Sequence, residues 1–154
     1  MRRQGGGHIV NTASLAGLLP FPFQALYCTS KRAVVGMSES MRFEFAEEGI
    51  HFSVVCPSNV ASAIWNKPII GSSDEKIKSP EDAIPAEQAA QDILTGVANK
   101  KGIIVVPEDQ VWQWRDYWRD PKSGESRLLQ MAHDTWTEFF NDPSSTYYQK
   151  GRKS

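Results

Sequence analysis

The stretch Gly5–Gly36, GGGHIVNTASLAGLLPFPFQALYCTSKRAVVG, decides the fold of this chain. The apolar run His8–Thr12 follows three glycines and is typical of a buried parallel β-strand. From Gln24 the pattern changes period, because apolar residues recur at spacings of three and four at Val34, Met37, Met41 and Phe45. This spacing predicts a helix that follows the strand and presents one apolar face.

Three polar residues lie at the junction of the predicted strand and helix. Ser14 follows the carboxyl end of the strand, where open parallel sheets bind their ligands. Tyr27 and Lys31 are four residues apart, so their side chains are expected on the same helix face. Each has an ordinary structural interpretation as well: a turn serine, a tyrosine packed on the sheet and a solvated lysine. Taken together, the three predict a reactive site.

A tyrosine beside a lysine is suited to proton transfer. A phenol titrates near pH 10, so at neutral pH it is a poor base and a slow proton donor. A nearby cation favours the phenolate, and lowering a phenol pKa to about 7 needs roughly 4 kcal/mol at about 1.4 kcal/mol per unit. A partly desolvated cleft with a cationic cofactor is a setting that could supply this. A serine hydroxyl could then hold the substrate oxygen, which points to chemistry at an alcohol or carbonyl.

Together with these three residues, the flanking sequences resemble the short-chain dehydrogenase/reductase family. The resemblance rests on GGHIVNTASLAG around Ser14, on the Tyr-x-x-x-Lys sequence YCTSK, and on GIHFSVVCP at Gly49–Pro57. It is clear over residues 5–64, weaker to residue 107 and absent beyond. It implies an α/β fold: a partial Rossmann-like, doubly wound parallel sheet made of the last three strands, with flanking helices and a helical C-terminal extension.

The resemblance also implies roles for particular residues. Tyr27 would be the acid/base, Lys31 would stabilise the phenolate and hold the nicotinamide ribose, and Ser14 would orient the carbonyl. The cofactor would be NAD or NADP. The residues expected to contact it are Tyr27, Lys31 and the later segment with Pro57, Ser58, Val60 and Ser62. Ser58 and Ser62 stand where the family usually has glycine and threonine.

The loop between Ser14 and Tyr27 must pass the proposed reacting centre. It is apolar and contains two prolines, so it suggests a pocket for a largely hydrophobic alcohol or carbonyl substrate, lined by Ala16, Leu18, Phe21 and Phe23. The alternative is that these residues simply cover the end of the sheet.

The dinucleotide-binding half that precedes the serine strand in this family has no counterpart in this sequence. Gly5–Gly7 leads into a strand rather than from a strand into a helix, so it is not a phosphate-binding loop. The family's upstream catalytic asparagine is also missing. We therefore expect a C-terminal half, which could be a fragment, a misplaced start or a genuine truncation.

An incomplete sheet has physical consequences. The strand at His8–Thr12 would have an unpaired apolar edge, which favours association with another chain. The small residues Ala33, Gly36 and Ser40 form a ridge on the predicted helix, where the family builds a dimer interface, so a homo-oligomer is expected. The predicted helix continues to about Glu48 and is capped by Gly49.

The rest of the chain divides into further elements. We expect a helix over 86–99 and a third buried strand over 102–107, with helix starts at Ser79–Asp82 and Pro85–Glu87. The segment 64–84 is a long loop that covers substrate in the family. Residues 1–107 would form the Rossmann-like domain and residues 108–154 a helical, aromatic-rich extension ending in a polar tail, 147–154. One helical face of this extension has Val111, Trp114 and Trp118, and another has Leu129, Ala132, Trp136 and Phe139.

The amino-acid composition limits which other classes of function are plausible. The 154 residues are 40% hydrophobic and 23% charged with a net charge of −1, which is ordinary for a soluble globular protein and gives no argument for nucleic acid. Acidic residues among the C-terminal aromatics also argue against base stacking, and a weakly basic polar face argues against a membrane helix. Core packing or a subunit contact is the better interpretation there. There is no membrane-spanning run or signal peptide, so a cytoplasmic location is expected.

Other chemistries find little support in the sequence. Cys28 and Cys56 form no Cys-x-x-Cys pair, which is typical of a reducing compartment. His8, His51 and His133 have no metal-ligand spacing, so no metal site is expected. ASLAG at 13–17 is not the Gly-x-Ser-x-Gly of a nucleophile elbow.

Two hypotheses follow. The first is an NAD(P)-dependent oxidoreductase, or its catalytic half, that interconverts an alcohol and a ketone or aldehyde by hydride transfer. The second is a catalytically silent fragment that acts only in subunit association.

Overall fold

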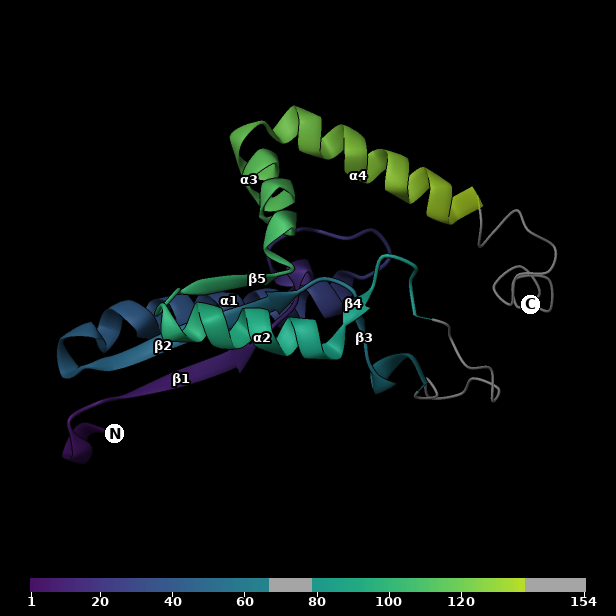
Figure 1. The fold of residues 1–154 in the computed structure, drawn as a ribbon. Helices are drawn as coiled ribbons and strands as arrows, with labels where there is room; N and C mark the ends of the chain where they lie inside the picture. The colour runs from purple at the N-terminus through teal and green to yellow at the C-terminus, as the bar shows by residue number, and fades with distance from the viewer. Residues whose placement is uncertain (67–78, 138–154) are drawn as a thin grey trace, which may run out of the picture.

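The computed structural model describes residues 1–66 and 79–137, which form an α/β fold (Figure 1). Its elements are β1 (Gly7–Thr12), α1 (Ala25–Glu44), β2 (Ile50–Pro57), β3 (Val60–Ala61), β4 (Ile84–Pro85), α2 (Ala86–Ala98), β5 (Ile103–Val106), α3 (Val111–Arg119) and α4 (Pro121–Trp136). Short 3₁₀ turns follow β1 and α1, at Leu15–Gly17 and Ala46–Glu48.

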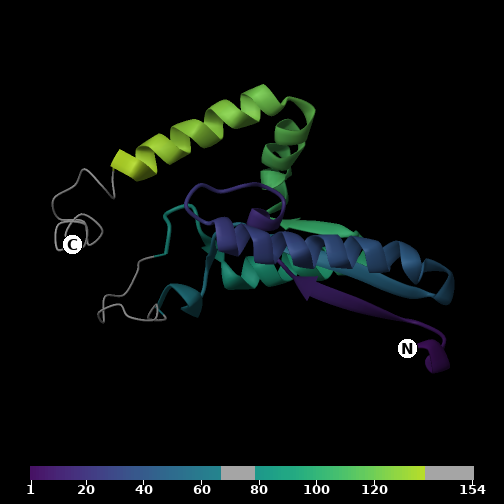
Figure 2. The same ribbon diagram turned by 180° about the vertical axis from the view of Figure 1, so that it is seen from behind.

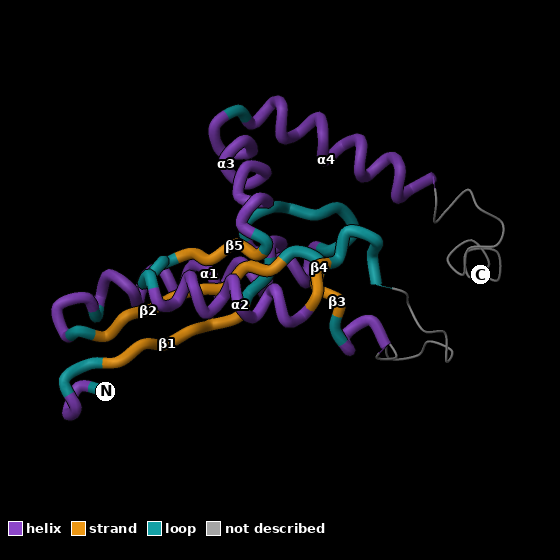
Figure 3. Tube along the Cα trace, in the orientation of Figure 1, coloured by secondary structure: helices purple, strands orange, loops and turns teal. Residues whose placement is uncertain are grey.

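The central layer is a parallel three-stranded sheet in the order β1-β2-β5. Helices α1 and α2 lie on its opposite faces, as the front and rear views show (Figures 1 and 2). Colouring by secondary structure makes the three layers plain (Figure 3). The predicted fold class, a parallel sheet with flanking helices and a helical C-terminal extension, is confirmed.

The two-residue period of the strands divides the core into two clusters. On the α1 face, Val54, Cys56 and Val105 pack with Leu15, Leu18 and Val35. On the α2 face, Val55, Ile104 and Val106 pack with Ala89. Residues of β2 are buried on both faces, as expected for a central parallel strand.

The boundaries of α1 differ slightly from those predicted. The α-helix ends at Glu44 rather than about Glu48, and the last turn is a separate 3₁₀ helix. Gly49 has φ +66°, the left-handed conformation that glycine adopts at a helix end without steric strain. Met37 is 49% exposed, because the buried stripe of α1 runs through Val35 and Ser38 instead.

The helix predicted to start at Ser79–Asp82 was wrong. Residues 80–83 form a turn in which the Ala83 N–H donates to the Pro80 carbonyl, and Ile84–Pro85 then pairs with Val60–Ala61 as a small parallel sheet. The Pro85–Glu87 helix start is correct, since α2 begins at Ala86. Part of the 64–84 loop, Phe139 and the 147–154 tail lie outside the described residues.

The C-terminal extension is anchored through α3. Val111, Trp114 and Tyr117 pack against the core cluster on the α1 face, so the core-packing interpretation holds for part of α3. It does not hold for Trp118, Leu129 and Trp136 of the predicted faces, which are 59%, 63% and 52% exposed. The Asp120 carboxylate caps α4 by accepting from the Lys122 N–H at 3.2 Å. No helix in the described ranges is long and apolar enough to cross a membrane.

The outer edge of β1 has no strand partner in the described part of the chain. Val10 is 41% exposed there, because α2 covers β2 and β5 and does not reach β1. Next to this edge, on the α1 side, a groove of about 610 Å³ is lined by Ile9, Met41 and Phe45 among others. The edge is therefore apolar and open.

A partly buried chain of hydrogen bonds fixes the beginning of the sheet. His8 Nε2 lies 2.8 Å from the hydroxyl of the fully buried Ser53, which in turn donates to the Lys101 carbonyl at 2.6 Å. His51 is the register partner of His8, and the two rings lie edge to face at 5.8 Å. Burial lowers the pKa of His8 below its ordinary 6.5, and repulsion from His51 and Lys100 adds to this effect.

This lowered pKa predicts a pH-dependent stability. At pH values between the folded-state pKa of His8 and 6.5, the unfolded chain binds more protons at His8 than the folded chain does. The contribution of neutral His8 to the free energy of unfolding is therefore fully present above pH 6.5 and is lost as the pH falls through the folded-state pKa. Urea unfolding at a series of pH values should show a decline in the free energy of unfolding below pH 6.5. His8→Gln should reduce that slope, whereas His133→Gln, at an exposed position on α4, should not. An unchanged slope in His8→Gln would contradict the assignment.

Candidate functional site

Ser14 lies where β1 ends and is the N-cap of the Leu15–Gly17 turn. Its Oγ accepts from the Ala16 N–H at 3.2 Å and donates to the Pro57 carbonyl at 3.4 Å. The second distance is beyond the usual range for an O–H···O bond, so that bond is weak. Ser14 thereby joins the carboxyl ends of β1 and β2, two of the segments predicted to form the site.

Tyr27 and Lys31 lie in the first two turns of α1, on one face, as the four-residue spacing predicts. The Lys31 ammonium lies 5.6 Å from the centre of the Tyr27 ring. Tyr27 is 44% exposed. Within residues 1–66 and 79–137, neither the phenolic hydroxyl nor the ammonium group forms a hydrogen bond or ion pair. Both groups therefore remain available to a bound molecule.

Gly17 connects the serine turn to the helix with the tyrosine and lysine. A Cβ at Gly17 would lie 2.8 Å from the Lys31 carbonyl oxygen and 2.8 Å from Cγ2 of Val35. These distances are too short for any side chain, so only glycine allows the turn to lie against the α1 backbone. This role was not predicted from the sequence, although a glycine three residues after the serine is a visible signal.

The segment after β2 continues from the serine contact. The Ser58 N–H donates to the Val106 carbonyl at 2.7 Å, which fixes this residue above the end of β5. Its φ is not positive, so serine in place of the family's glycine meets no backbone strain. Val60 packs on the α2-face core, and the Trp65 indole donates to its carbonyl at 2.8 Å. Ser62 is exposed, so its hydroxyl can be reached from solvent.

The four predicted pocket residues in the loop between Ser14 and Tyr27 differ in their exposure to solvent. Ala16 and Leu18 are 2% and 4% exposed and belong to the interior, as expected of residues that cover the end of the sheet. Phe21 packs against the same core. Phe23 alone is well exposed, and its ring lies 6.2 Å from that of Trp136 at the end of α4. Local sequence patterns contain no signal for this contact, because the two residues are 113 positions apart.

Cys56 lies beneath the serine turn and is fully buried. Burial raises the pKa of its thiol to about 12, an effect opposed by a hydrogen bond from the Ser14 backbone. The thiol therefore stays protonated and has a packing role. Both cysteines are free. No cluster of three or more potential metal ligands occurs among the residues that the structure describes.

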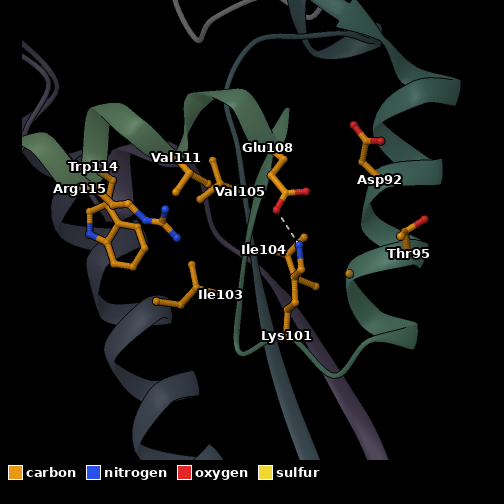
Figure 4. A pocket seen from close by; sticks show the side chains of 11 residues that line it. Asp92, Thr95, Lys101, Ile103, Ile104, Val105, Glu108, Val111, Trp114 and Arg115 are labelled. Atoms are coloured by element: carbon orange, nitrogen blue, oxygen red, sulfur yellow. Dashed lines mark hydrogen bonds and ion pairs between the residues drawn. The ribbon is translucent and has the colours of Figure 1, made fainter.

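A separate cavity of about 240 Å³ lies between α2, β5 and the start of α3 (Figure 4). Its walls combine Ile103, Val105 and Trp114 with charged side chains, and Lys101 and Glu108 form an ion pair there at 2.7 Å. None of Ser14, Tyr27 and Lys31 lines it. It lies at the β5 edge of the sheet and is distinct from the serine–tyrosine–lysine site.

The fold and site define an α/β protein of the doubly wound type, with a serine at a strand end and a tyrosine–lysine pair on the following helix. The profile of the short chain dehydrogenase family matches residues 1–69. Residues 1–69 thus belong to the short-chain dehydrogenase/reductase family.

Two relatives illustrate the sequence similarity. The chain is 43% identical over 70 residues to the inactive 2-(S)-hydroxypropyl-CoM dehydrogenase 2 of Xanthobacter autotrophicus, covering 46% of this chain and 30% of the relative. It is 30% identical over 106 residues to the D-beta-hydroxybutyrate dehydrogenase of Rhizobium meliloti, covering 68% of this chain and 39% of the relative. The chain therefore spans less than half of either relative.

Two solved structures show the similarity of fold. A short-chain dehydrogenase from Burkholderia cenocepacia, in complex with NADP, aligns with a TM-score of 0.66 at 20% identity, over 82% of this chain and 49% of that one. A short-chain dehydrogenase/reductase from Burkholderia phymatum, in complex with NAD, aligns with a TM-score of 0.63 at 24% identity, over 79% and 50%. At these identities the likeness is one of fold.

The Gly17 contact generates a test of how the site is held together. Gly17→Ala should lower the free energy of unfolding by about 1–3 kcal/mol, because its Cβ forces the serine turn away from α1. Gly36→Ala is the matched control: it lies within α1 with open space around it, so the same change should raise stability by up to about 1 kcal/mol. Denaturant unfolding measures both. Equal effects at the two glycines would show that the turn does not depend on this contact.

Proposed function

We propose that the chain provides the catalytic part of an NAD(P)-dependent oxidoreductase that interconverts an alcohol and a ketone or aldehyde. The observation that carries the proposal is the pairing of Tyr27 and Lys31 on one face of α1, with the serine turn packed against the Lys31 backbone through Gly17. The match of residues 1–69 to a family of dehydrogenases supports it. The substrate would be a small, largely hydrophobic molecule.

Each of the three residues has a distinct role in this proposal. The Ser14 hydroxyl, whose bond to Pro57 is long, turns to donate to the substrate oxygen and so orients the reacting carbonyl. Tyr27 gives its phenolic proton to that oxygen in reduction and takes it back in oxidation. The Lys31 ammonium stabilises the negative charge that develops on the phenolic oxygen during the transfer.

NAD or NADP is the proposed cofactor, as in the two structural neighbours. The residues described above fit its nicotinamide half. Lys31 and Tyr27 have free polar groups, Ser58 is held without strain, and the Ser62 hydroxyl is exposed. Pro57, Ser58, Val60 and Ser62 would contact the nicotinamide. When bound, the cofactor supplies the redox chemistry, which is exchange of a hydride with the substrate carbon.

The first test measures binding and turnover together. NADH or NADPH binding to the full chain, followed by nicotinamide fluorescence, should be saturable and should weaken in Lys31→Met. Tyr27→Phe should lower kcat/KM for carbonyl reduction by roughly 10²–10⁴-fold, because proton transfer to the substrate oxygen is lost, and should weaken nucleotide binding far less than it lowers turnover. Tyr117→Phe, the same change on α3, is the control. Wild-type turnover in Tyr27→Phe, or a folded chain without nucleotide binding, would refute the oxidoreductase proposal.

A second candidate function, subunit association without catalysis, is favoured by the open edge of β1. Val10 is exposed along an edge whose outer backbone groups are free to pair with another strand. The small residues Ala33, Gly36 and Ser40 are exposed on α1 and offer a second contact surface for a homo-oligomer. One relative with 43% identity is itself described as inactive.

Association through the β1 edge predicts a specific mutational effect. Val10→Lys places a charge on the open edge and should shift the chain toward monomer in analytical ultracentrifugation, because a charged edge opposes strand pairing. Leu94→Lys, at an exposed position on α2, is the matched control and should leave the distribution unchanged. If Val10→Lys associates as wild type does, β1 is not the contact.

A further inference from the structure

We propose that Phe23 and Trp136 form an aromatic cover beside the Ser14–Tyr27–Lys31 site that selects substrates with a planar, apolar body. The substrate class is a ketone or alcohol attached to an aromatic or fused-ring system. The inference rests on the proposed function for its location, since it assigns a specificity element to that same site.

The first observation is the contact itself. The Phe23 and Trp136 rings lie 6.2 Å apart with an angle of 33° between their planes. Despite this contact they are 57% and 52% exposed. Two large rings that touch each other and still present more than half of their surface offer aromatic faces on which a flat molecule can stack.

The second observation is the backbone of Phe23. Within residues 1–66 and 79–137, the non-glycine residues with positive φ are Phe23 at 61° and Lys100 at 53°. Lys100 follows α2 directly, at a position where helices commonly end in this conformation. Phe23 precedes a helix, where no such rule applies, and a bulky residue is unfavourable there. Such strain is found where surrounding contacts hold a residue for a function.

The third observation is position along the fold. Tyr27 follows Phe23 by four residues, within the first turn of α1, so the strained phenylalanine stands at the entrance to the helix that carries the proposed acid/base. The backbone loop from Ser14 to Phe23 passes below α4 in both views (Figures 1 and 2). Trp136 therefore reaches the site region from the far end of the chain.

The fourth observation is that α4 is held in place. Trp114 and Tyr117 anchor α3 in the core, and the Arg32 guanidinium of α1 lies 5.9 Å from the Trp118 ring. The Asp120 cap then sets the start of α4. The indole of Trp136 is thus carried by a supported helix, which gives the cover a defined geometry.

The two rings of the cover are apolar as well as flat. Phe23 and Trp136 are uncharged, and Phe21 and Leu26, which are close to Phe23 in the sequence, are apolar. Stacking on aromatic faces favours planar over puckered rings, since only a planar ring brings all of its atoms into contact. The cover should therefore discriminate by planarity more strongly than by size.

The test compares two ketones with the same carbon skeleton, the planar aromatic acetylnaphthalene and its puckered, saturated counterpart acetyldecalin. Calorimetry on the full chain should show roughly five- to tenfold tighter binding of acetylnaphthalene. Phe23→Leu and Trp136→Leu should each remove most of that preference and leave acetyldecalin binding unchanged. The double variant should lose little more than either single one, because the rings act as a unit. Trp112→Leu, at a similarly exposed tryptophan on α3, should keep the preference.

The outcomes separate this inference from the proposed function. Equal binding of the two ketones, binding of neither, or an unchanged preference in Phe23→Leu and Trp136→Leu overturns the cover, whatever the turnover. Thermal unfolding near that of wild type shows that the variants are folded. A planarity preference that depends on both rings supports the cover, even in a chain without turnover or in Tyr27→Phe. The oxidoreductase proposal is then judged by its own test.

Discussion

The close approach of Gly17 to the α1 backbone is the constraint on which the site depends. The Leu15–Gly17 turn touches the Lys31 carbonyl at a distance that no side chain permits. Because Ser14 caps that turn and Lys31 lies on the opposing helix, one backbone contact sets the separation between the serine and the tyrosine–lysine pair. The packing of Leu15 and Leu18 against Val35 then holds the turn in place.

The sheet connects the serine turn to the segments that follow β2 and β5. Alternate residues of β2 and β5 point to the α1 and α2 faces, so each strand contributes to both cores and cannot shift register without exposing one of them. Ser14 also bonds to the end of β2, and Ser58 bonds to Val106 at the end of β5. The three strand ends are therefore aligned by hydrogen bonds at the edge where the proposed cofactor contacts lie.

The sequence allowed much of this to be predicted, for physical reasons that differ between elements. Strands β1 and β5 and helices α1 and α2 follow from apolar patterns, and β2 follows from the resemblance of Gly49–Pro57, whereas the short strands β3 and β4 were not predicted. The Tyr27–Lys31 pairing follows from helical spacing alone. The turn at residues 80–83 was misjudged because proline and acidic residues favour turns as readily as helix starts. Met37 was placed on the buried face because period alone does not say where a helix meets its sheet. The Phe23–Trp136 contact depends on the path of α3 and α4, which no local pattern encodes.

Part of the exposed apolar surface lies on the elements that carry the proposed site. Val10 on β1 and Leu26, Met37 and Phe43 on α1 are all exposed. Any molecule that binds the folded chain and covers this surface raises the stability of the folded state, by mass action. Because α1 also holds Tyr27 and Lys31, that stabilisation would act on the helix that must keep the pair aligned. Association on β1 or α1 would therefore stabilise the folded state in which the Gly17 contact exists, and with it the arrangement that the proposed chemistry requires.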